Sequence, residues 1–181
     1  MHTEPSRGLR YICGRWLELT AKKIYPDKTA VRRNVRVLAV SSGGGHWVEL
    51  QRLKPAFEGC DIAFATVKDG YRADVSDSRF YVVPDSNIRE KVALMRTALI
   101  VLGVLLRERP QVIISTGAAP GYLALHFGKW MGARTIWLDS MANAEKLSLS
   151  GQKAGRYADL WLTQWAHLAE KDGPQFYGSV L

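Results

Sequence analysis

The chain has 181 residues, of which 47% are hydrophobic and 23% are charged, a composition typical of a single globular domain. Its two cysteines, Cys13 and Cys60, lie far apart in no metal-ligand spacing, which argues against a disulfide scaffold. The formal net charge is +8, and nine basic against three acidic residues place +6 of it within residues 1–36. A basic segment of this kind suits an anionic membrane surface or a nucleic acid.

The sequence predicts neither a secretory signal nor a membrane span. Its start is polar, and no small-residue cleavage site follows an apolar core. The longest apolar run covers residues 98–106 and has nine residues, against the roughly 20 that a helix needs to cross a bilayer. Any contact with a membrane is therefore expected to be peripheral.

Residues 7–25 predict an amphipathic helix that ends before Pro26. One interpretation is that its apolar side chains dock on the domain. The other is an interfacial helix, with Tyr11 and Trp16 among lipid headgroups and basic residues toward anionic lipid, namely Arg10, Arg15, Lys22 and Lys23. The residues alone favour neither. On the second interpretation, neutralising these four together with Arg7 releases the protein from anionic vesicles.

From Val35 onward, strands alternate with helices. Strands are expected over residues 35–40, 61–66, 80–83, 112–115, 135–138 and 160–163. Helices are expected over residues 46–57, 88–106 and 122–131, with an exposed polar loop over residues 68–78. This order predicts an α/β, Rossmann-like parallel sheet with helices on both faces. Residues 1–34 would form a basic helix and linker, and residues 35–181 the domain.

The expected helix over residues 88–106 has a wider apolar face than one packing seam requires. Packing against the sheet accounts for most of this face. Part of it could instead contact lipid.

A glycine loop follows the first expected strand, at the edge where ligands bind in such sheets. Ser42, Gly43, Gly44 and Gly45 precede an expected helix, so backbone amides and the positive helix end could hold a phosphate. The alternative is a tight turn without a ligand. The spacing matches neither a dinucleotide fingerprint nor a P-loop. His46 follows as a possible general base, or only as a polar cap.

Two further loops follow later strands. The second of the three loops begins with Thr116 and Gly117, which are further candidate site residues. In the third, Asp139 could orient a sugar hydroxyl or act as a base. The alternative for this segment is a helix cap with a serine-rich turn. The polar residues of this loop that are candidates to bind a ligand are Ser140, Asn143, Glu145, Ser148 and Ser150.

These loops carry a resemblance to a known family. The stretch 41–46, Ser-Ser-Gly-Gly-Gly-His, looks like the acceptor-side glycine loop of GT-B glycosyltransferases. The segments 138–140, 147–151, 157–159 and 164–165 resemble the membrane-recruiting subunit of the bipartite GlcNAc transferase of asparagine-linked glycan synthesis. Bacterial PssD-like glucuronosyltransferase subunits of exopolysaccharide assembly are similar. The resemblance covers residues 35–181, and residues 177–181 look like the end of that subunit.

The resemblance implies that the chain is the amino-terminal half of a split GT-B enzyme. A separate subunit would hold the UDP-sugar, forming a heterodimer that transfers the sugar to a polyprenyl-diphosphate-linked acceptor. The implied place is peripheral, on the cytoplasmic face of the plasma membrane, with no cofactor, metal or nucleic acid. His46 matches a histidine important for activity in related enzymes. Asn143 stands where eukaryotic relatives have a basic residue, and together with the missing amino-terminal span it points to the bacterial branch, so the donor sugar stays open between glucuronic acid, GlcNAc and galactose.

Three other functions are compatible with parts of the sequence. The chain could be an inactive scaffold that brings a complete catalytic partner to the membrane. A nucleic-acid-binding domain would use the basic amino-terminal segment, but no recognition motif accompanies it. A self-sufficient small enzyme would need a second half to close over a nucleotide-sugar.

Overall fold

The computed structural model describes residues 5–24, 35–86 and 91–180, with side chains for all of them except residues 5–7 and 20–24. The described part forms one sheet of seven parallel strands in the order β3-β2-β1-β4-β5-β6-β7. The strands are β1 (Arg36–Val40), β2 (Asp61–Thr66), β3 (Arg79–Val82), β4 (Val112–Ser115), β5 (Arg134–Leu138), β6 (Leu160–Thr163) and β7 (Gln175–Phe176). This confirms the predicted α/β, Rossmann-like class.

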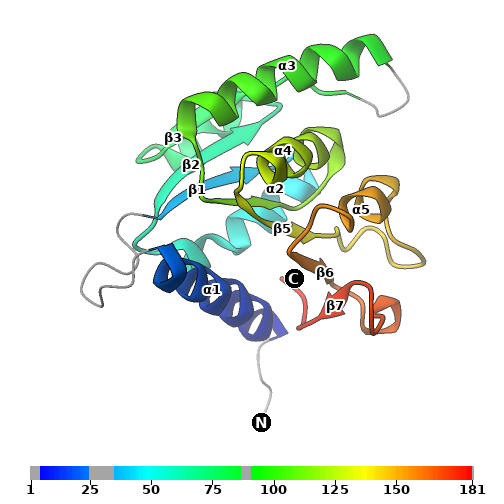
Figure 1. Ribbon diagram of the computed structural model, residues 1–181. Helices are drawn as coiled ribbons and strands as arrows, with labels where there is room; N and C mark the ends of the chain where they lie inside the picture. The colour runs from blue at the N-terminus through cyan, green and yellow to red at the C-terminus, as the bar shows by residue number, and fades with distance from the viewer. Residues whose placement is uncertain (1–4, 25–34, 87–90, 181) are drawn as a thin grey trace.

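Helices cover both faces of the sheet, with α1 on one side and α3 and α4 on the other (Figure 1). The α-helices are α1 (Pro5–Ile24), α2 (Gly45–Arg52), α3 (Lys91–Glu108), α4 (Ala118–Trp130) and α5 (Leu149–Ala154). Three short 3₁₀ helices accompany them, η1 (Lys54–Phe57), η2 (Asp69–Val75) and η3 (Ala166–Leu168). None of the helices in the described ranges is both long and apolar enough to cross a membrane.

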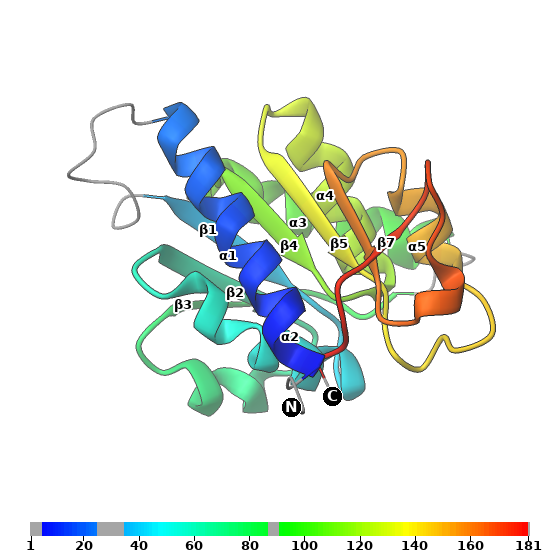
Figure 2. The same cartoon turned by 90° about the horizontal axis from the view of Figure 1, so that it is seen from below.

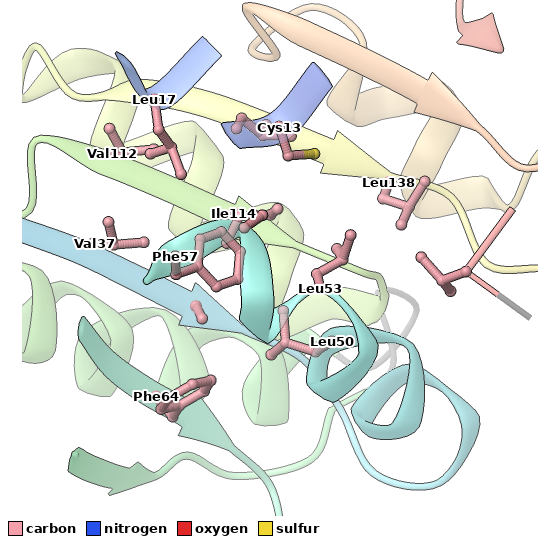
Figure 3. Close-up of a cluster of buried hydrophobic side chains, with 14 of the residues drawn as sticks. Cys13, Leu17, Val37, Leu50, Leu53, Phe57, Phe64, Val112, Ile114 and Leu138 are labelled. Atoms are coloured by element: carbon pink, nitrogen blue, oxygen red, sulfur yellow. The ribbon is translucent and has the colours of Figure 1, made fainter. Parts of the chain in front are cut away.

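Two apolar clusters, one on each face, hold these layers together. Successive residues of a strand point to opposite faces, so Val37 and Ala39 join the cluster under α1 and α2, while Leu38 and Val40 join the cluster under α3, α4 and α5. Figure 3 shows the first cluster, in which α1 and α2 meet the central strands. Because both faces are covered, the strands read as nearly continuous apolar runs.

Helix α1 lies across the sheet (Figure 2) and docks its apolar stripe on it. Leu9, Cys13 and Leu17 follow one another at four-residue spacing, and all three are buried. Burial raises the pKa of the Cys13 thiol to about 12. The Arg134 guanidinium lies over the Trp16 ring, 5.0 Å from its centroid. The apolar stripe of this helix therefore takes the docked arrangement, whereas the side chains of Lys22 and Lys23, and Pro26, lie outside the described residues.

Several element boundaries differ from the sequence prediction. Helix α4 begins at Ala118 rather than at residue 122, because Pro120 lies in its first turn, where a missing N–H breaks no helical bond. The expected helix over residues 46–57 divides into α2 and η1, where Pro55 cannot donate a bond to extend α2. Within the expected loop at residues 68–78, residues 69–75 form η2; most of the segment is exposed as predicted, and Val75 is buried. Helix α5 and strand β7 were not predicted.

The carboxyl-terminal segment closes the first cluster. Val180 is buried, its amide donates to Gln164 Oε1 at 2.9 Å, and its carbonyl accepts from Arg52 Nη1 at 3.0 Å. Gln164 Nε2 in turn donates to the Asp139 carbonyl at 3.0 Å. The 164–165 segment noted in the sequence thus connects the chain end to the loop after β5.

The strand order places a topological switch point between β1 and β4. The chain runs outward from β1 through β2 to β3, then crosses over through α3 to β4 on the other side of β1. The loops after β1 and β4 therefore part in opposite directions at the carboxyl edge. In open α/β sheets a ligand crevice forms at such a point.

Candidate functional site

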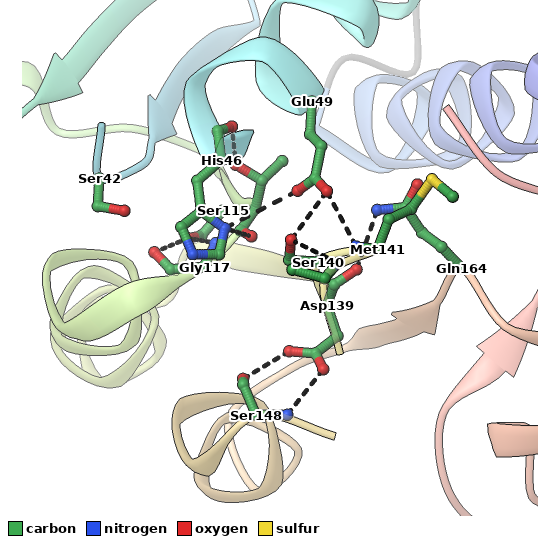
Figure 4. Close-up of polar contacts among 12 residues, drawn as sticks. Ser42, His46, Glu49, Ser115, Gly117, Asp139, Ser140, Met141, Ser148 and Gln164 are labelled. Carbon is green, nitrogen blue, oxygen red and sulfur yellow. Dashed lines mark hydrogen bonds and ion pairs between the residues drawn. The ribbon is translucent and has the colours of Figure 1, made fainter. Parts of the chain in front are cut away.

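His46 and Thr116 meet across the switch point. His46 Nδ1 lies 2.9 Å from the Thr116 carbonyl oxygen, and the Thr116 hydroxyl donates back to the His46 carbonyl at 2.7 Å. A Cβ on Gly117, whose φ is 145°, would lie 2.5 Å from His46 Cε1. Only glycine allows this approach, so the loop after β4 fixes the imidazole of His46, which follows the loop after β1 (Figure 4).

The tautomer of His46 follows from this contact. A carbonyl oxygen only accepts, so Nδ1 carries the proton and leaves Nε2 as the basic atom of the neutral ring. The Glu49 carboxylate, whose Oε2 lies 3.8 Å from Nδ1, raises the pKa of His46 above its ordinary value, and burial opposes this effect. The ring is thus oriented and basic, as a general base must be.

Glu49 was not predicted from the sequence. It is only 3% exposed, and its Oε1 accepts from the Ser140 hydroxyl and from the Met141 amide, both at 2.9 Å. The available signal was spacing: an acidic residue three positions after His46 lies on the same face of α2. Burial between two loops, which makes this carboxylate important, could not be deduced from spacing.

Asp139 lies in the same region, but its carboxylate is already occupied. Oδ2 accepts the Ser148 amide at 2.9 Å, and Oδ1 accepts the Ser148 hydroxyl at 2.6 Å and Trp137 Nε1 at 3.2 Å. Ser148 in turn caps α5 by accepting the Gly151 amide at 2.8 Å. The geometry therefore matches the helix-cap interpretation of this segment, and the catalytic role of Asp139 stays a prediction.

A cavity of about 1260 Å³ opens at this edge of the sheet. Four of the predicted site residues line it, namely His46, Asn143, Ser148 and Ser150. Lys146, Lys153 and Asp85 also line it and were not predicted as site residues. A neighbouring cavity of about 530 Å³ shares Asp85 and adds Lys91, Val92 and Arg96 from the start of α3. Basic side chains therefore line both cavities, while the residue that the two cavities share, Asp85, is acidic.

The other predicted site residues do not line the cavity. The Gly44 amide donates to the Tyr71 hydroxyl at 2.9 Å, and the Ser42 carbonyl accepts from the Thr66 hydroxyl. Gly43 packs near the Lys68 side chain, and Gly45 begins α2. Thr116, Gly117 and Ser140 hold His46 and Glu49, and Glu145 is exposed beside the lining.

One lining residue is strained. Ala118 has a φ of 63°, a left-handed conformation that residues with a Cβ seldom adopt, and it lies beside His46 at the start of α4. Strain of this kind costs about 1–3 kcal/mol and concentrates at functional sites. Within residues 5–24, 35–86 and 91–180, no three His, Cys, Asp or Glu side chains are grouped to hold a metal ion.

The model of the family described as "Oligosaccharide biosynthesis protein Alg14 like" matches residues 75–180. The chain belongs to the Alg14-like family. The matched range includes the loop after β5, with Asp139 and Ser148, and all three lysines that line the two cavities. His46 and Glu49 precede this range.

Curated Alg14 proteins are similar over part of the chain. The UDP-N-acetylglucosamine transferase subunit ALG14 of Eremothecium gossypii is 26% identical in an alignment of 167 residues that covers 75% of each chain. The protein with the same description from Yarrowia lipolytica is 32% identical over 81 residues, which are 41% of this chain and 38% of that protein. These similarities confirm the resemblance to the GlcNAc transferase subunit.

Solved structures show the same fold in larger enzymes. Acinetobacter baumannii MurG superposes with a TM-score of 0.66 at 9% identity, over 80% of this chain and 46% of that chain. A putative UDP-N-acetylglucosamine 2-epimerase from Listeria monocytogenes gives 0.54 at 10% identity, over 72% of this chain and 39% of that chain. The chain therefore has the Rossmann-like fold of these longer chains and spans less than half the length of each.

Proposed function

We propose that this protein is the acceptor-side subunit of a two-component, UDP-sugar-dependent glycosyltransferase. The observation that carries the proposal is the open cavity at the switch point, formed by a chain that covers only 46% of MurG. In two-domain enzymes of this fold the cleft lies between two halves. A second subunit that holds the UDP-sugar would complete the cleft, in agreement with relatives that are themselves described as transferase subunits.

The acceptor is proposed to be a sugar linked through a diphosphate to a polyprenyl lipid. Lys146 and Lys153 line the larger cavity, and Lys91 and Arg96 line the smaller one. Four cations around two adjoining cavities suit a diphosphate, while the polar cavity wall with Asn143 and Ser150 suits sugar hydroxyls. The shared lining residue Asp85 makes the two cavities neighbours, so one elongated ligand can occupy both.

His46 would act as the base. Its Nε2 would take the proton of the acceptor hydroxyl as that oxygen bonds to the anomeric carbon of the donor sugar. As this bond forms, the bond between the anomeric carbon and the UDP oxygen breaks, and UDP leaves with the bonding electron pair. The partner subunit would stabilise the negative charge on UDP. The Thr116 carbonyl keeps the His46 ring in the tautomer that this step requires.

Helix α3 is proposed as the membrane contact. Val92, Met95, Leu99 and Leu106 are all more than half exposed and follow one another at three-, four- and seven-residue spacing, so they form one stripe. Basic Lys91, Arg96 and Arg107 are exposed on the same helix. An exposed apolar stripe with basic neighbours fits an anionic bilayer surface. The smaller cavity includes Val92, so the acceptor lipid would leave the site along this stripe.

UDP-N-acetylglucosamine is the first donor to test, because the curated relatives are described as subunits of a transferase of that sugar. UDP-glucuronic acid is the second, from the resemblance to exopolysaccharide enzymes. The proposed place is peripheral, on the cytoplasmic face of the plasma membrane, where lipid-linked acceptors and nucleotide-sugars meet.

The test is a transfer assay with the co-expressed donor-binding subunit, a UDP-sugar and a polyprenyl-diphosphate-linked acceptor. We expect transfer to require both subunits. His46→Ala should lower kcat by about 10²- to 10⁴-fold, the usual contribution of a general base, without preventing subunit assembly. His167→Asn is the matched control, because His167 is exposed and lies outside the cavity lining.

Two outcomes would overturn the proposal. Full activity of His46→Ala would make the chain a scaffold for a complete catalytic partner. Transfer by this chain alone would remove the division of labour between two subunits.

A further inference from the structure

The carboxylate of Glu49 lies between the loops that follow β1 and β5. It extends from α2, one turn after His46, and reaches Ser140 and Met141 of the later loop (Figure 4). Its side chain is nearly fully buried. Taking a carboxylate out of water is costly unless a partner stabilises its charge. The position of Glu49 therefore calls for a partner of positive charge.

The two oxygens of Glu49 are used differently. Oε1 accepts both hydrogen bonds, from the Ser140 hydroxyl and from the Met141 amide. Oε2 is buried and accepts no hydrogen bond from any described residue. It lies 3.8 Å from His46 Nδ1. A residue that only joined the two loops would need Oε1 alone, so the second oxygen points to a role toward the imidazole.

We propose that Glu49 is the positioning residue of His46: it holds the imidazole against Thr116 and stabilises the imidazolium that forms during sugar transfer. This inference rests on the proposed function, in which His46 is the base. Glu49 is not among the residues that line either cavity, so in this arrangement it acts only through His46. When Nε2 takes the acceptor proton, the ring becomes positive beside the Glu49 carboxylate, so the charged state is favoured.

Other charged groups face the same imidazole. Asp139, from the end of β5, also raises the pKa of His46, but more weakly than Glu49. Asp85, Lys146 and Lys153 line the cavity into which His46 opens. The two lysines oppose protonation of the ring, and they border open solvent, which screens them. Buried Glu49 is therefore the dominant negative group beside His46.

The first measurement is an NMR titration of the histidine rings in the full chain. The four histidines are separated by comparing the wild type with His46→Gln. We expect wild-type His46 to titrate above the ordinary histidine value and to titrate lower in Glu49→Gln. The amide keeps an oxygen acceptor for Ser140 and Met141. Glu58→Gln, the same change at an exposed carboxylate, should leave the His46 titration unchanged.

This measurement does not depend on activity, so it separates the pairing from the proposed function. An unchanged His46 titration in folded Glu49→Gln overturns the inference, whatever the transfer assay shows. If that variant does not fold, the wild type decides: a His46 that titrates at or below its ordinary value overturns the pairing. A lowered titration together with a fully active His46→Ala would instead overturn the proposed function.

The second measurement is the pH profile of transfer by the assembled enzyme. A protonated His46 cannot accept the proton, so its titration sets the acidic limb of kcat. In Glu49→Gln we expect this limb to move to lower pH, and kcat to fall by less than the roughly 10²- to 10⁴-fold loss expected for removing the base. KM for the acceptor should stay unchanged. A fall in kcat with an unmoved limb would show that Glu49 only joins the loops, and would overturn the inference.

Discussion

Helices α1 and α3 cover opposite faces of one sheet, and both carry apolar and basic residues, yet they use their apolar faces differently. Leu17 of α1 is 1% exposed, whereas Leu99 of α3 is 67% exposed. The basic α1 segment is the more obvious membrane helix in the sequence. The structure shows that the apolar stripe of α1 is buried against the sheet, whereas α3 has an apolar stripe that is exposed.

The difference shows what an amphipathic pattern leaves open. Helical spacing establishes that a face avoids water, but it does not say what covers that face. Within residues 8–19 of α1, Leu9, Cys13 and Leu17 form a stripe at four-residue spacing that packs on the sheet. Helix α3 has two: Val101, Val104 and Leu105 pack on the sheet, and Leu99 belongs to the other, which no described element covers. A second stripe is the feature that calls for a partner.

The largest expected effect is on stability. Leu17→Ala should lower the free energy of unfolding by about 2–5 kcal/mol, because it leaves a cavity between α1 and the sheet. Leu99→Ala should change the free energy of unfolding by no more than about 0.5 kcal/mol, because most of the Leu99 side chain is exposed to water in the folded protein. Urea unfolding followed by circular dichroism measures both variants. Equal losses would mean that the α3 stripe is packed in solution, and the comparison would fail.

The sheet could be predicted well because its strands have a strong local signal. The fourth expected strand, residues 112–115, and the sixth, residues 160–163, match β4 and β6. Buried parallel strands are β-branched or aromatic runs bounded by turns, and this holds without tertiary context. Residues 149–154 and 175–176 lack such a signal. Helix α5 depends on a cap held by Asp139, and β7 depends on pairing with β6, so neither could be predicted from local sequence.

The candidate site was predicted in composition but not in the direction of its side chains. His46 was expected at a helix start beside the glycine loop, and its side chain lines the cavity. Asp139 also follows a strand, but its carboxylate turns to the Ser148 cap rather than to the cavity. Glu49 contacts Ser140, 91 positions later in the chain. Contacts of this range arise only when β1 and β5 enter the same sheet, so spacing could not identify them.

A smaller effect is expected on membrane binding. The double change Met95→Glu and Leu99→Glu should weaken binding to vesicles that contain phosphatidylglycerol by about a hundredfold. Each buried apolar side chain contributes roughly 1.5–3 kcal/mol, and partial burial at an interface lowers this to about half. Vesicle co-sedimentation measures the change. Glu substitutions at Asp77 and Asp172, which are exposed and already acidic, provide the control. Unchanged binding would exclude α3 as the membrane contact.

The smallest effect is expected from the α1 charges, and it decides between the two helices. Arg10 and Arg15 are solvent-accessible, and Arg10 Nε also donates to the Arg52 carbonyl at 2.9 Å. If α3 faces the membrane, α1 lies on the opposite side of the sheet from the lipid. Its distance from the membrane surface is then about twice the roughly 10 Å spacing of packed layers, which exceeds the Debye length of about 8 Å. Arg10→Gln with Arg15→Gln should then change vesicle binding at physiological salt by less than about twofold. If α1 instead faced the lipid, each arginine would contribute about 1 kcal/mol to the free energy of membrane binding. The two substitutions together would then release the protein from the vesicles in a salt-dependent way. A large release by these two changes would therefore move the membrane contact from α3 to α1, while the stability difference between Leu17→Ala and Leu99→Ala would still stand.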